Sequence, residues 1–443
     1  MTDGERGGRR GFSGWWDDTP PCRSVDCYRK IAKIEEGQYG VVYKAQDKET
    51  GEIVALKKVK PIATLDEGFP ITSLREIRAM MLQGRGHPNI VQVREIVASS
   101  PAPVSTTETQ KNQASSSSAA DASAVSSAVS GTPTVYIVME YLDHDLKSLL
   151  DTTRGHFLQS EVKCLVQQLL TAIAYMHDTC WMIHRDLKTS NLLYSNNGYL
   201  KVADFGLARL YTSAPSDAPS LGRMTPLVVT LWYRAPELLL GEECYTTAVD
   251  MWSVGCIFAE IVLRQPLFAG HSESEQLHLI FQALGSPTAD GCWPDYLSLP
   301  HAKKLVSAAA RGCQPGINPR FLERFRGSLT QSGLDLLLRM LAYDPKRRIT
   351  AAEALKHRYF TDEPLPRDIA LMPTWPSSHA FERSKRERTP PVNPLLVAQE
   401  LARAEPAAKH PHLDRAQQPS SSSSILLDDD DEDDGVLPLP SSS

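Results

Sequence analysis

The sequence of 443 residues lacks any long apolar segment: nowhere do about eighteen apolar residues, the minimum for a membrane-crossing helix, follow one another. It also lacks paired cysteines, because its eight cysteines are scattered and none forms the CxxC spacing typical of zinc and dithiol redox sites. We therefore expect no membrane partner and reduced cysteine thiols. Hydrophobic residues (42%) and charged residues (23%) occur in the proportions of an ordinary globular protein.

The chain has little net charge outside one segment. The formal net charge is −6, but the seven consecutive acidic residues Asp428–Asp434 contribute −7, so the remainder sums to +1. A nearly neutral body lacks the basic surface with which proteins attract nucleic acid. We therefore expect no direct nucleic-acid contact.

Composition divides the chain into a globular middle and two polar ends. The predicted segments are a disordered N-terminal segment (1–27), a globular domain (28–360), a C-terminal extension that packs on it (361–382) and a disordered, acidic tail (383–443). A stretch within the domain, residues 99–133, is rich in Ser, Ala, Thr and Pro and is predicted to be a disordered insertion. The tail begins with a basic run, Arg383–Arg388, for which a nuclear-import patch and a solvated linker both remain open.

The domain begins with short β-type runs and continues with helices. Runs of β-branched or alternating residues predict strands at 32–34, 40–44, 53–57, 90–93 and 135–139. Leu74, Ile77 and Met81 fall on one face of a helix that should start near Ser73.

Helical periodicity continues in the second part of the domain. It predicts a helix over Val162–His177, while Asp250–Val262 is apolar nearly all round and should form a buried axis. The predicted fold class is α+β, with a small β-rich lobe that carries one helix and a larger helical lobe.

Two short strings carry the chemistry: His184-Arg185-Asp186-Leu187-Lys188-Thr189-Ser190-Asn191 and Asp204-Phe205-Gly206. Phosphoryl transfer from ATP needs one carboxylate to hold the incoming hydroxyl, and an amide and a second carboxylate to hold Mg²⁺ on the phosphates. Asp186 is predicted to orient the hydroxyl and accept its proton, with Lys188 as a point charge on the transferred phosphate. Asn191 and Asp204 are predicted to bind Mg²⁺.

A glycine-containing turn and a lysine precede these strings. In Ile34–Val42, Gly37 and Gly40 would let the backbone approach phosphates, although Glu35 stands where the first glycine of such a loop is usual. Lys57 ends an apolar strand, and a buried ammonium needs anions, which ATP phosphates and Glu76 would supply.

Glu76 has a second interpretation. Ser73-Leu74-Arg75-Glu76 is also a capping box, in which the Glu76 carboxylate would bond back to the Ser73 amide. Both arrangements are compatible with different positions of the helix, capping when it is swung out and pairing with Lys57 when it is in.

The string Phe69-Pro70-Ile71-Thr72-Ser73-Leu74-Arg75-Glu76-Ile77 resembles the cyclin-binding helix of the cyclin-dependent kinases, specifically those of PITSLRE type. The stretches 225–237 and 372–376 share the resemblance, which covers 28–376 apart from the insertion. It implies a bilobal protein-kinase fold with ATP in the cleft, and a cyclin-dependent Ser/Thr kinase that acts on Ser/Thr-Pro sites.

The resemblance also implies which residues surround the nucleotide. Met139 would be the gatekeeper, Glu140 and Leu142 would bond the adenine through their backbone, and Asp145 would face the ribose. The adenine would be sandwiched by the apolar side chains of Ile34, Val42, Ala55 and Leu193.

Regulation and substrate choice follow from the same likeness. A cyclin of the L type would dock on Ile71 and Leu74, and Tyr39 would be an inhibitory phosphorylation site. Val229 and Arg234 would shape the pocket for the substrate residue that follows the phosphate-accepting Ser or Thr. Thr225, in the segment before Ala235-Pro236-Glu237, is predicted to be phosphorylated by an upstream kinase. Its phosphate would gather three arginines, Arg75, Arg185 and Arg209. Glu237 is predicted to form a structural ion pair with Arg348.

Two other functions stay open on the residues alone: a catalytically inactive cyclin-binding scaffold and a mitogen-activated-type kinase. The complete set Lys57, Glu76, Asp186, Asn191 and Asp204 argues against the scaffold. A mitogen-activated-type kinase would carry a Thr-x-Tyr pair, whereas Pro226 and Leu227 follow Thr225 here. The resemblance further implies a nuclear protein of transcription, pre-mRNA splicing or cell-cycle control, with a cytoplasmic pool left open.

Overall fold

The computed structural model of the chain describes residues 22–36, 40–59, 71–99, 134–153, 155–211, 231–288 and 291–376. Four residues with predicted roles, Gly37, Tyr39, Thr225 and Val229, lie outside these ranges. So do 1–21 of the N-terminal segment, 100–133 of the insertion and the whole tail from 383.

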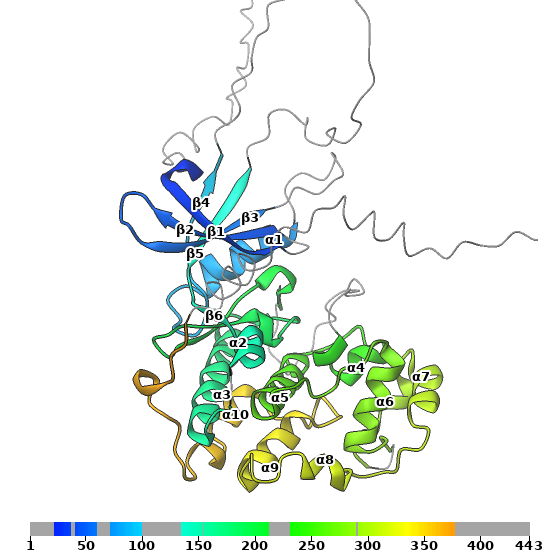
Figure 1. Cartoon of the computed structure of the whole chain (residues 1–443). Helices are drawn as coiled ribbons and strands as arrows, with labels where there is room; N and C mark the ends of the chain where they lie inside the picture. Colours follow the sequence, from blue (N-terminus) through cyan, green and yellow to red (C-terminus); the bar gives the residue numbers. More distant parts are fainter. Residues whose placement is uncertain are drawn as a thin grey trace, which may run out of the picture. The chain divides into compact units, whose positions relative to one another are not determined.

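Five antiparallel strands form the small lobe, in the order β1-β2-β3-β5-β4 (Figure 1). Their bounds are β1 Tyr28–Glu36, β2 Gly40–Asp47, β3 Ile53–Val59, β4 Val93–Ala98 and β5 Val135–Glu140. Alternate side chains of the strands build a small apolar core that includes Val54, Leu56 and Val138. The sheet therefore holds β3, with Lys57, between β2 and β5.

One helix packs beside this sheet. Helix α1 spans Ile71–Arg78 and continues as a wider π-helical turn, Ala79–Gln83. It begins two residues before the predicted start at Ser73, and Gly84 ends it as predicted.

The larger lobe is helical, and its bounds are α2 Leu146–Thr152, α3 Gln159–Ala174, α4 Pro236–Leu239, α5 Ala248–Leu263, α6 Glu273–Leu284, α7 Ala302–Ala309, α8 Pro319–Glu323, α9 Gln331–Met340 and α10 Ala351–Leu355. Short strands complete it, namely β6 His144–Asp145, β7 Met182–Ile183, β8 Leu192–Tyr194, β9 Leu200–Val202 and β10 Arg209–Leu210. The predicted α+β, two-lobed fold class is confirmed. Among the helices of the described ranges, none combines the length and apolar content needed to cross a membrane.

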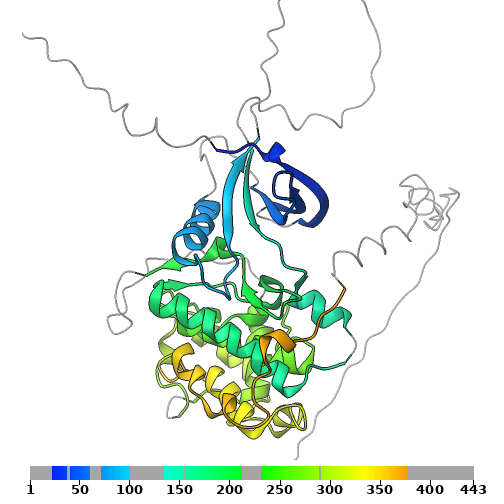
Figure 2. The ribbon, with the colours of Figure 1, turned by 90° about the vertical axis from the view of Figure 1, so that its left-hand side faces the viewer.

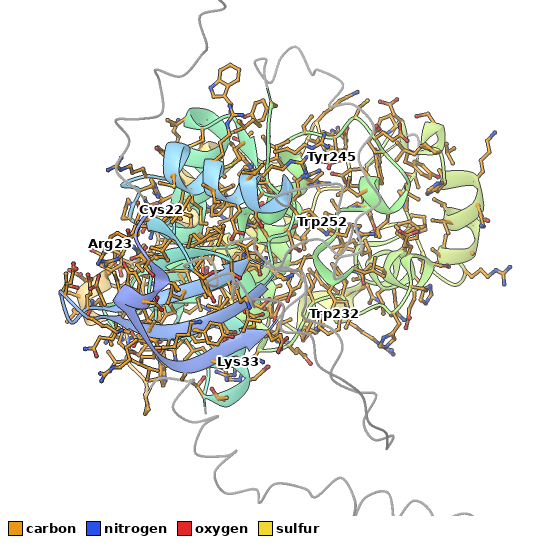
Figure 3. The ribbon with its side chains drawn as sticks, turned by 90° about the horizontal axis from the view of Figure 1, so that it is seen from above. Cys22, Arg23, Lys33, Trp232, Tyr245 and Trp252 are labelled. Atoms are coloured by element: carbon orange, nitrogen blue, oxygen red, sulfur yellow. The ribbon has the colours of Figure 1, made fainter. Side chains whose placement is uncertain are left out.

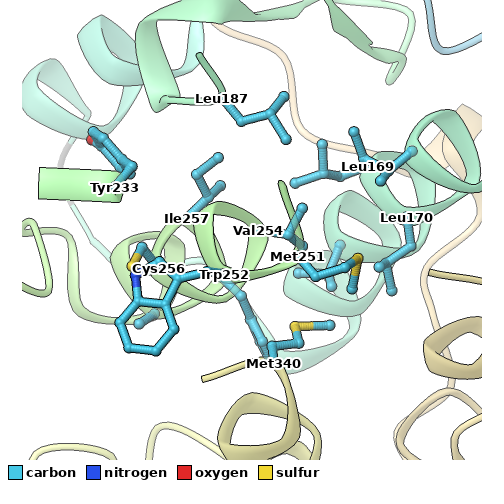
Figure 4. Close-up of a cluster of buried hydrophobic side chains, with 14 of the residues drawn as sticks. Leu169, Leu170, Leu187, Tyr233, Met251, Trp252, Val254, Cys256, Ile257 and Met340 are labelled. Atoms are coloured by element: carbon cyan, nitrogen blue, oxygen red, sulfur yellow. The ribbon is translucent and has the colours of Figure 1, made fainter. Parts of the chain in front are cut away.

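Helix α5 is the buried axis of this lobe. Every residue from Ala248 to Val262 is buried, as its all-round apolar sequence predicted. Figure 4 shows Met251 and Val254 of α5 near Leu169 and Leu170 of α3. Arg348 and Glu237, both buried near this helix, form the predicted ion pair at 2.7 Å.

The start of the described chain differs from the prediction. Residues 22–27, assigned to the disordered segment, lie along β4 instead: Ala98 N–H donates to Arg23 O (3.2 Å), and Arg23 Nη1 lies 2.8 Å from Glu95 Oε1. Figure 3 labels Cys22 and Arg23 beside the sheet. Long-range ion pairs and the buried side chain of Val25 order this segment, and polar composition alone does not reveal them.

The described part of the predicted C-terminal extension, 361–376, packs on the helical lobe. Arg367 N–H donates to Ser160 O (2.9 Å), and the Arg367 guanidinium lies 2.8 Å from Glu161 Oε1 at the start of α3. Residues 377–382 lie outside the described ranges. Figure 2 shows the described residues up to 376 in orange against α3.

Candidate active site

Lys57 is the central residue of the site in the small lobe. Its neighbours across the sheet are Val42 on β2 and Ile137 on β5, and only 9% of the residue is exposed. Lys57 Nζ lies 2.5 Å from Glu76 Oε1 on α1 and 3.2 Å from Asp204 Oδ1 in the large lobe. One ammonium thus joins the sheet, the helix and the segment that carries Asp204.

Lys57 is shared by two carboxylates. Burial, against the attraction of Lys57 and together with the charge of Asp204, raises the pKa of Glu76. Burial alone would lower the pKa of Lys57, but the carboxylates of Glu76 and Asp204 outweigh burial and raise its pKa above the usual value. Burial likewise opposes ionisation of Asp204, yet the attraction of Lys57 lowers the pKa of Asp204. Lys57 therefore stays protonated and Asp204 ionised at neutral pH.

Of the two arrangements predicted for Glu76, this structure shows the pairing with Lys57 and not the capping box. Ser73 is the third residue of α1, so it is not the residue that caps the helix, and the Glu76 carboxylate accepts from Lys57. The charged hydrogen bond to a buried ammonium outcompetes the weaker local bond that the sequence suggested.

Asp186, Lys188 and Asn191 meet in one loop. Lys188 Nζ lies 2.9 Å from Asp186 Oδ2, and Asn191 Nδ2 donates to Asp186 O (2.8 Å) and Oδ2 (3.1 Å). Asp186 is only 7% exposed. The predicted catalytic groups are therefore neighbours, and the Asp186 carboxylate is oriented from two sides.

Asp250 of α5 holds this loop from below. Its carboxylate accepts from the N–H groups of His184 and Arg185, both at 2.8 Å, and lies 2.9 Å from His177 Nε2. Burial would raise the pKa of Asp250, but the hydrogen bond and charge of His177 and the other donors lower it. Arg185 adopts a left-handed backbone (φ 71°), a strained conformation that these bonds hold next to Asp186.

Sequence reasoning missed the role of Asp250. The available signal was a carboxylate inside an otherwise apolar run, because a buried charge must find partners. Those partners are 65 to 73 positions away in the chain, so their identity was not visible in the sequence.

Asn191 and Asp204 fit a magnesium site. Ala203 N–H donates to Asn191 O at 2.9 Å, which fixes the residue before Asp204 beside Asn191. Because Asn191 Nδ2 is used by Asp186, its side-chain oxygen is the atom left to act as a ligand. One amide oxygen and one carboxylate suit Mg²⁺, which usually takes few protein ligands alongside phosphates and water.

The predicted nucleotide-lining residues come from both lobes. Val42 lies opposite Lys57 and Ala55 opposite Met139 in the sheet, while Leu193 lies opposite Asp145 between β8 and β6. A side chain at Gly40 would collide with Lys58 O, so the start of β2 requires glycine. Ile34 belongs to β1, at a register shift between β1 and β2.

The two residues predicted to bond the adenine through their backbone, Glu140 and Leu142, place their side chains in different surroundings. Leu142 is buried, whereas the Glu140 carboxylate accepts from Lys201 Nζ (2.7 Å) and Gln92 N–H (2.8 Å). Asp145 has an additional task, because its Oδ1 accepts from Ser148 N–H (2.8 Å) and caps α2.

The predicted arginines gather where α1 meets β10. Arg75, Arg78 and Arg209 line a cavity of about 190 Å³ with Met182, Ala208 and Leu210. Burial first, and then the positive charges of Arg185 and Arg75, lowers the pKa of Arg209, so the three predicted arginines lie within electrostatic reach. Arg78 was not predicted. Thr225, their expected partner, lies outside the described ranges.

The remaining predicted residues lie on two surfaces. Arg234 lines a small cavity of about 20 Å³ with Asp186, and its Nη1 lies 3.3 Å from Glu273 Oε1. Leu74 is 52% exposed on α1, as a docking residue should be. Ile71 is the first residue of the same helix, and the structure describes its backbone but not its side chain.

Comparison with known proteins adds to this geometry. A family model described as a protein kinase domain matches residues 28–360. Human cyclin-dependent kinase 11B is 47% identical over 369 residues, which cover 83% of this chain and 40% of that protein. The serine/threonine-protein kinase PITSLRE of Drosophila melanogaster is 45% identical over 390 residues, covering 87% and 37%. Cyclin-dependent kinase 11 of Dictyostelium discoideum is 49% identical over 358 residues, covering 81% and 87%.

The relatives differ in length. The chain spans about two fifths of the human and fly proteins but most of the Dictyostelium protein. The likeness to these proteins therefore concerns the domain that they share.

Proposed function

We propose that this chain, which belongs to the protein kinase family and within it to the PITSLRE-type cyclin-dependent kinases, transfers the γ-phosphate of ATP to serine or threonine side chains. The observation that carries the proposal is the contact of Lys57 with both Glu76 and Asp204. A kinase needs this ion pair and the second carboxylate in place together for transfer.

The loop residues perform the chemistry. Asp186 orients the substrate hydroxyl and accepts its proton, and Asn191 and Lys188 keep its carboxylate in one orientation. Lys188 faces the transferred phosphate, while Lys57 anchors the other phosphates with its ammonium held by Glu76. Positioning and electrostatics supply most of the catalysis in such a reaction.

Asn191 and Asp204 would hold Mg²⁺. When bound there, the ion neutralises charge on the phosphate oxygens. The chain's own contribution is an amide oxygen and an ionised carboxylate on two backbone segments that are hydrogen-bonded to each other at Ala203 and Asn191.

A cyclin of the L type is the proposed activating partner. Exposed Leu74 supports docking on α1, the helix whose Glu76 must stay against Lys57. An upstream kinase is proposed to phosphorylate Thr225, and the cluster of Arg75, Arg185 and Arg209 supports binding of that phosphate. Such a phosphate would tie together the helix, the catalytic loop and the segment after Asp204.

The proposed substrates are proteins with Ser/Thr-Pro sites, presented beside Arg234.

The proposed setting is the nucleus, in transcription, pre-mRNA splicing or cell-cycle control, by likeness to the PITSLRE-type family. Imaging of the tagged chain tests the location, with Arg383–Arg388 replaced by alanines to test that run as an import patch. An exclusively cytoplasmic signal of the unmodified chain would refute the nuclear location.

The deciding experiment measures γ-phosphate transfer to a Ser-Pro peptide by the full chain with its cyclin. We expect Asp186→Asn to lower kcat by about 10²–10⁴-fold while nucleotide still binds. A matched Ser-Ala peptide tests the proline preference. Equal transfer by the wild type and Asp186→Asn would refute the assignment of Asp186.

The same assay separates the other functions. A wild-type chain that binds nucleotide and cyclin but transfers no phosphate would be a scaffold. Full activity of the phosphorylated chain without any cyclin would favour a mitogen-activated-type kinase.

A further inference from the structure

The segment after the last helix of the large lobe ends against β6 (Figure 1, orange). Trp375 is its contact residue. The indole packs edge-on against His144 (ring centroids 6.4 Å apart), Phe157 (5.7 Å) and Tyr194 (5.5 Å). His144 and Tyr194 are 1% and 0% exposed, and the partly buried indole of Trp375 packs against them at the edge of the core.

Hydrogen bonds fix the backbone around Trp375 as well. The Asn196 side chain forms two hydrogen bonds with the backbone of Trp375: Oδ1 accepts from Trp375 N–H (3.0 Å), and Nδ2 donates to Trp375 O (2.9 Å). Tyr194 Oη donates to Pro373 O at 2.7 Å. Upstream, a side chain at Gly198 would collide with Ile369 O, so the segment lies directly on the β8–β9 turn.

The strands under Trp375 also carry two predicted nucleotide residues. His144 pairs with Tyr194 and Asp145 with Leu193 across β6 and β8. Because successive side chains of a strand point to opposite faces, His144 and Tyr194 face Trp375 while Asp145 and Leu193 face away from it. The tryptophan therefore supports the back of the strand pair that presents Asp145 and Leu193.

We propose that Trp375 is a positioning residue for the nucleotide: by packing behind β6 and β8, it fixes Asp145 at the ribose and Leu193 under the base. This inference rests on the proposed function, in which those two residues contact ATP. Trp375 itself touches neither nucleotide nor substrate. Its loss lets the strand pair shift, and a small displacement at the ribose contact weakens nucleotide binding.

The experiment measures equilibrium binding of Mg-ATP and of Mg-2′,3′-dideoxy-ATP to the full chain, for the wild type and Trp375→Ala. We expect Trp375→Ala to bind ATP about tenfold more weakly. Its loss in affinity for the dideoxy nucleotide should be clearly smaller, because the ribose hydroxyl contact is already missing. A merely destabilised protein would lose affinity for both nucleotides equally.

Three further variants complete the test. Trp375→Phe should restore most of the affinity, since a phenyl ring keeps the edge-on packing. Asn196→Ala should reproduce the selective loss, because it removes both backbone bonds to Trp375. Leu371→Ala is the matched control, because Leu371 lies on the same segment but is 64% exposed and should bind like the wild type.

The outcomes are distinct. Unchanged ATP affinity in Trp375→Ala, equal losses for both nucleotides, or the same loss in Leu371→Ala would overturn the inference. If Trp375→Ala does not fold, Asn196→Ala decides by the same criteria. A wild-type chain that binds no ATP would instead refute the proposed function.

Discussion

Lys57 Nζ and Asp204 Oδ1 lie 3.2 Å apart although 147 positions separate the two residues in the chain. Lys57 belongs to the sheet, and Asp204 follows a strand of the helical lobe. With Glu76 on the same ammonium, this contact joins three elements of the fold: the sheet, helix α1 and the segment that carries Asp204. The catalytic geometry therefore depends on the position of α1, which is the element best placed to be controlled.

Glu76→Gln tests that dependence. The variant removes the negative charge that holds Lys57, so we expect kcat/KM of the cyclin complex to fall by about 10²-fold. Steady-state kinetics measure the loss. Combining Glu76→Gln with Lys57→Met should cost little more than Lys57→Met alone, because both act through one pair. Additive losses would contradict a shared role.

Leu74→Glu tests the docking surface on α1. A charge at a half-exposed apolar position should weaken cyclin binding by more than about tenfold if Leu74 lies at the centre of the interface. Titration calorimetry measures the affinity. The melting temperature should not change, and Leu297→Glu, at a similarly exposed leucine (50%), is the control that should leave binding intact. Unfolding of Leu74→Glu would show that Leu74 belongs to the core instead.

Arg348→Met tests the buried ion pair with Glu237. The variant leaves the Glu237 carboxylate, 2% exposed, without its cation, so the free energy of unfolding should fall by about 3–5 kcal/mol. Urea denaturation measures the change. Replacing Glu237 with methionine as well should recover most of the loss. A loss below about 1 kcal/mol in the single variant would contradict a stabilising role of this buried pair.

Asp250→Asn tests the support of the catalytic loop and its pH dependence. The folded state lowers the pKa of Asp250, so its carboxylate adds stability above the unfolded pKa of about 3.9, and this is lost as pH falls through the folded pKa. We expect the variant to be about 2–3 kcal/mol less stable at pH 7. The difference from the wild type should shrink below about pH 4.

Urea denaturation from pH 7 to pH 3 measures this difference. Asp151→Asn is the control, because Asp151 forms an exposed pair with Lys147 (2.8 Å). That variant should change stability by less than about 0.5 kcal/mol. A difference for Asp250→Asn that grows toward acid would contradict the lowered pKa.

Much of the fold was predictable because its signals are local. Runs of β-branched or alternating residues predicted the strands around Lys57, and the apolar run that starts at Asp250 predicted the buried helix α5. One strand was misplaced: the run 90–93 was predicted, whereas β4 is Val93–Ala98. Ile90 instead bridges to Val202 of the large lobe, so burial between lobes produced an apolar run that imitates a strand.

The site was predictable as far as its residues are close in sequence. Asp186, Lys188 and Asn191 share one string and one loop, so their chemistry and their contacts coincide. Contacts between distant segments were out of reach, as with Asp250 under His184 or Trp375 behind His144, 231 positions apart. Glu76 is an intermediate case, because the local pattern left a cap at Ser73 and a pair with Lys57 both open, and only the structure shows that the pair forms.

The two ends of the long insertion are joined in the sheet. Ser99 N–H donates to Thr134 O at 2.8 Å, at the point where β4 ends and β5 begins. Since the cost of closing a loop depends only weakly on its length, the stretch between these partners can be exchanged without moving the strands. This junction is therefore a natural site at which to graft a fluorescent reporter or a short turn without disturbing the sheet.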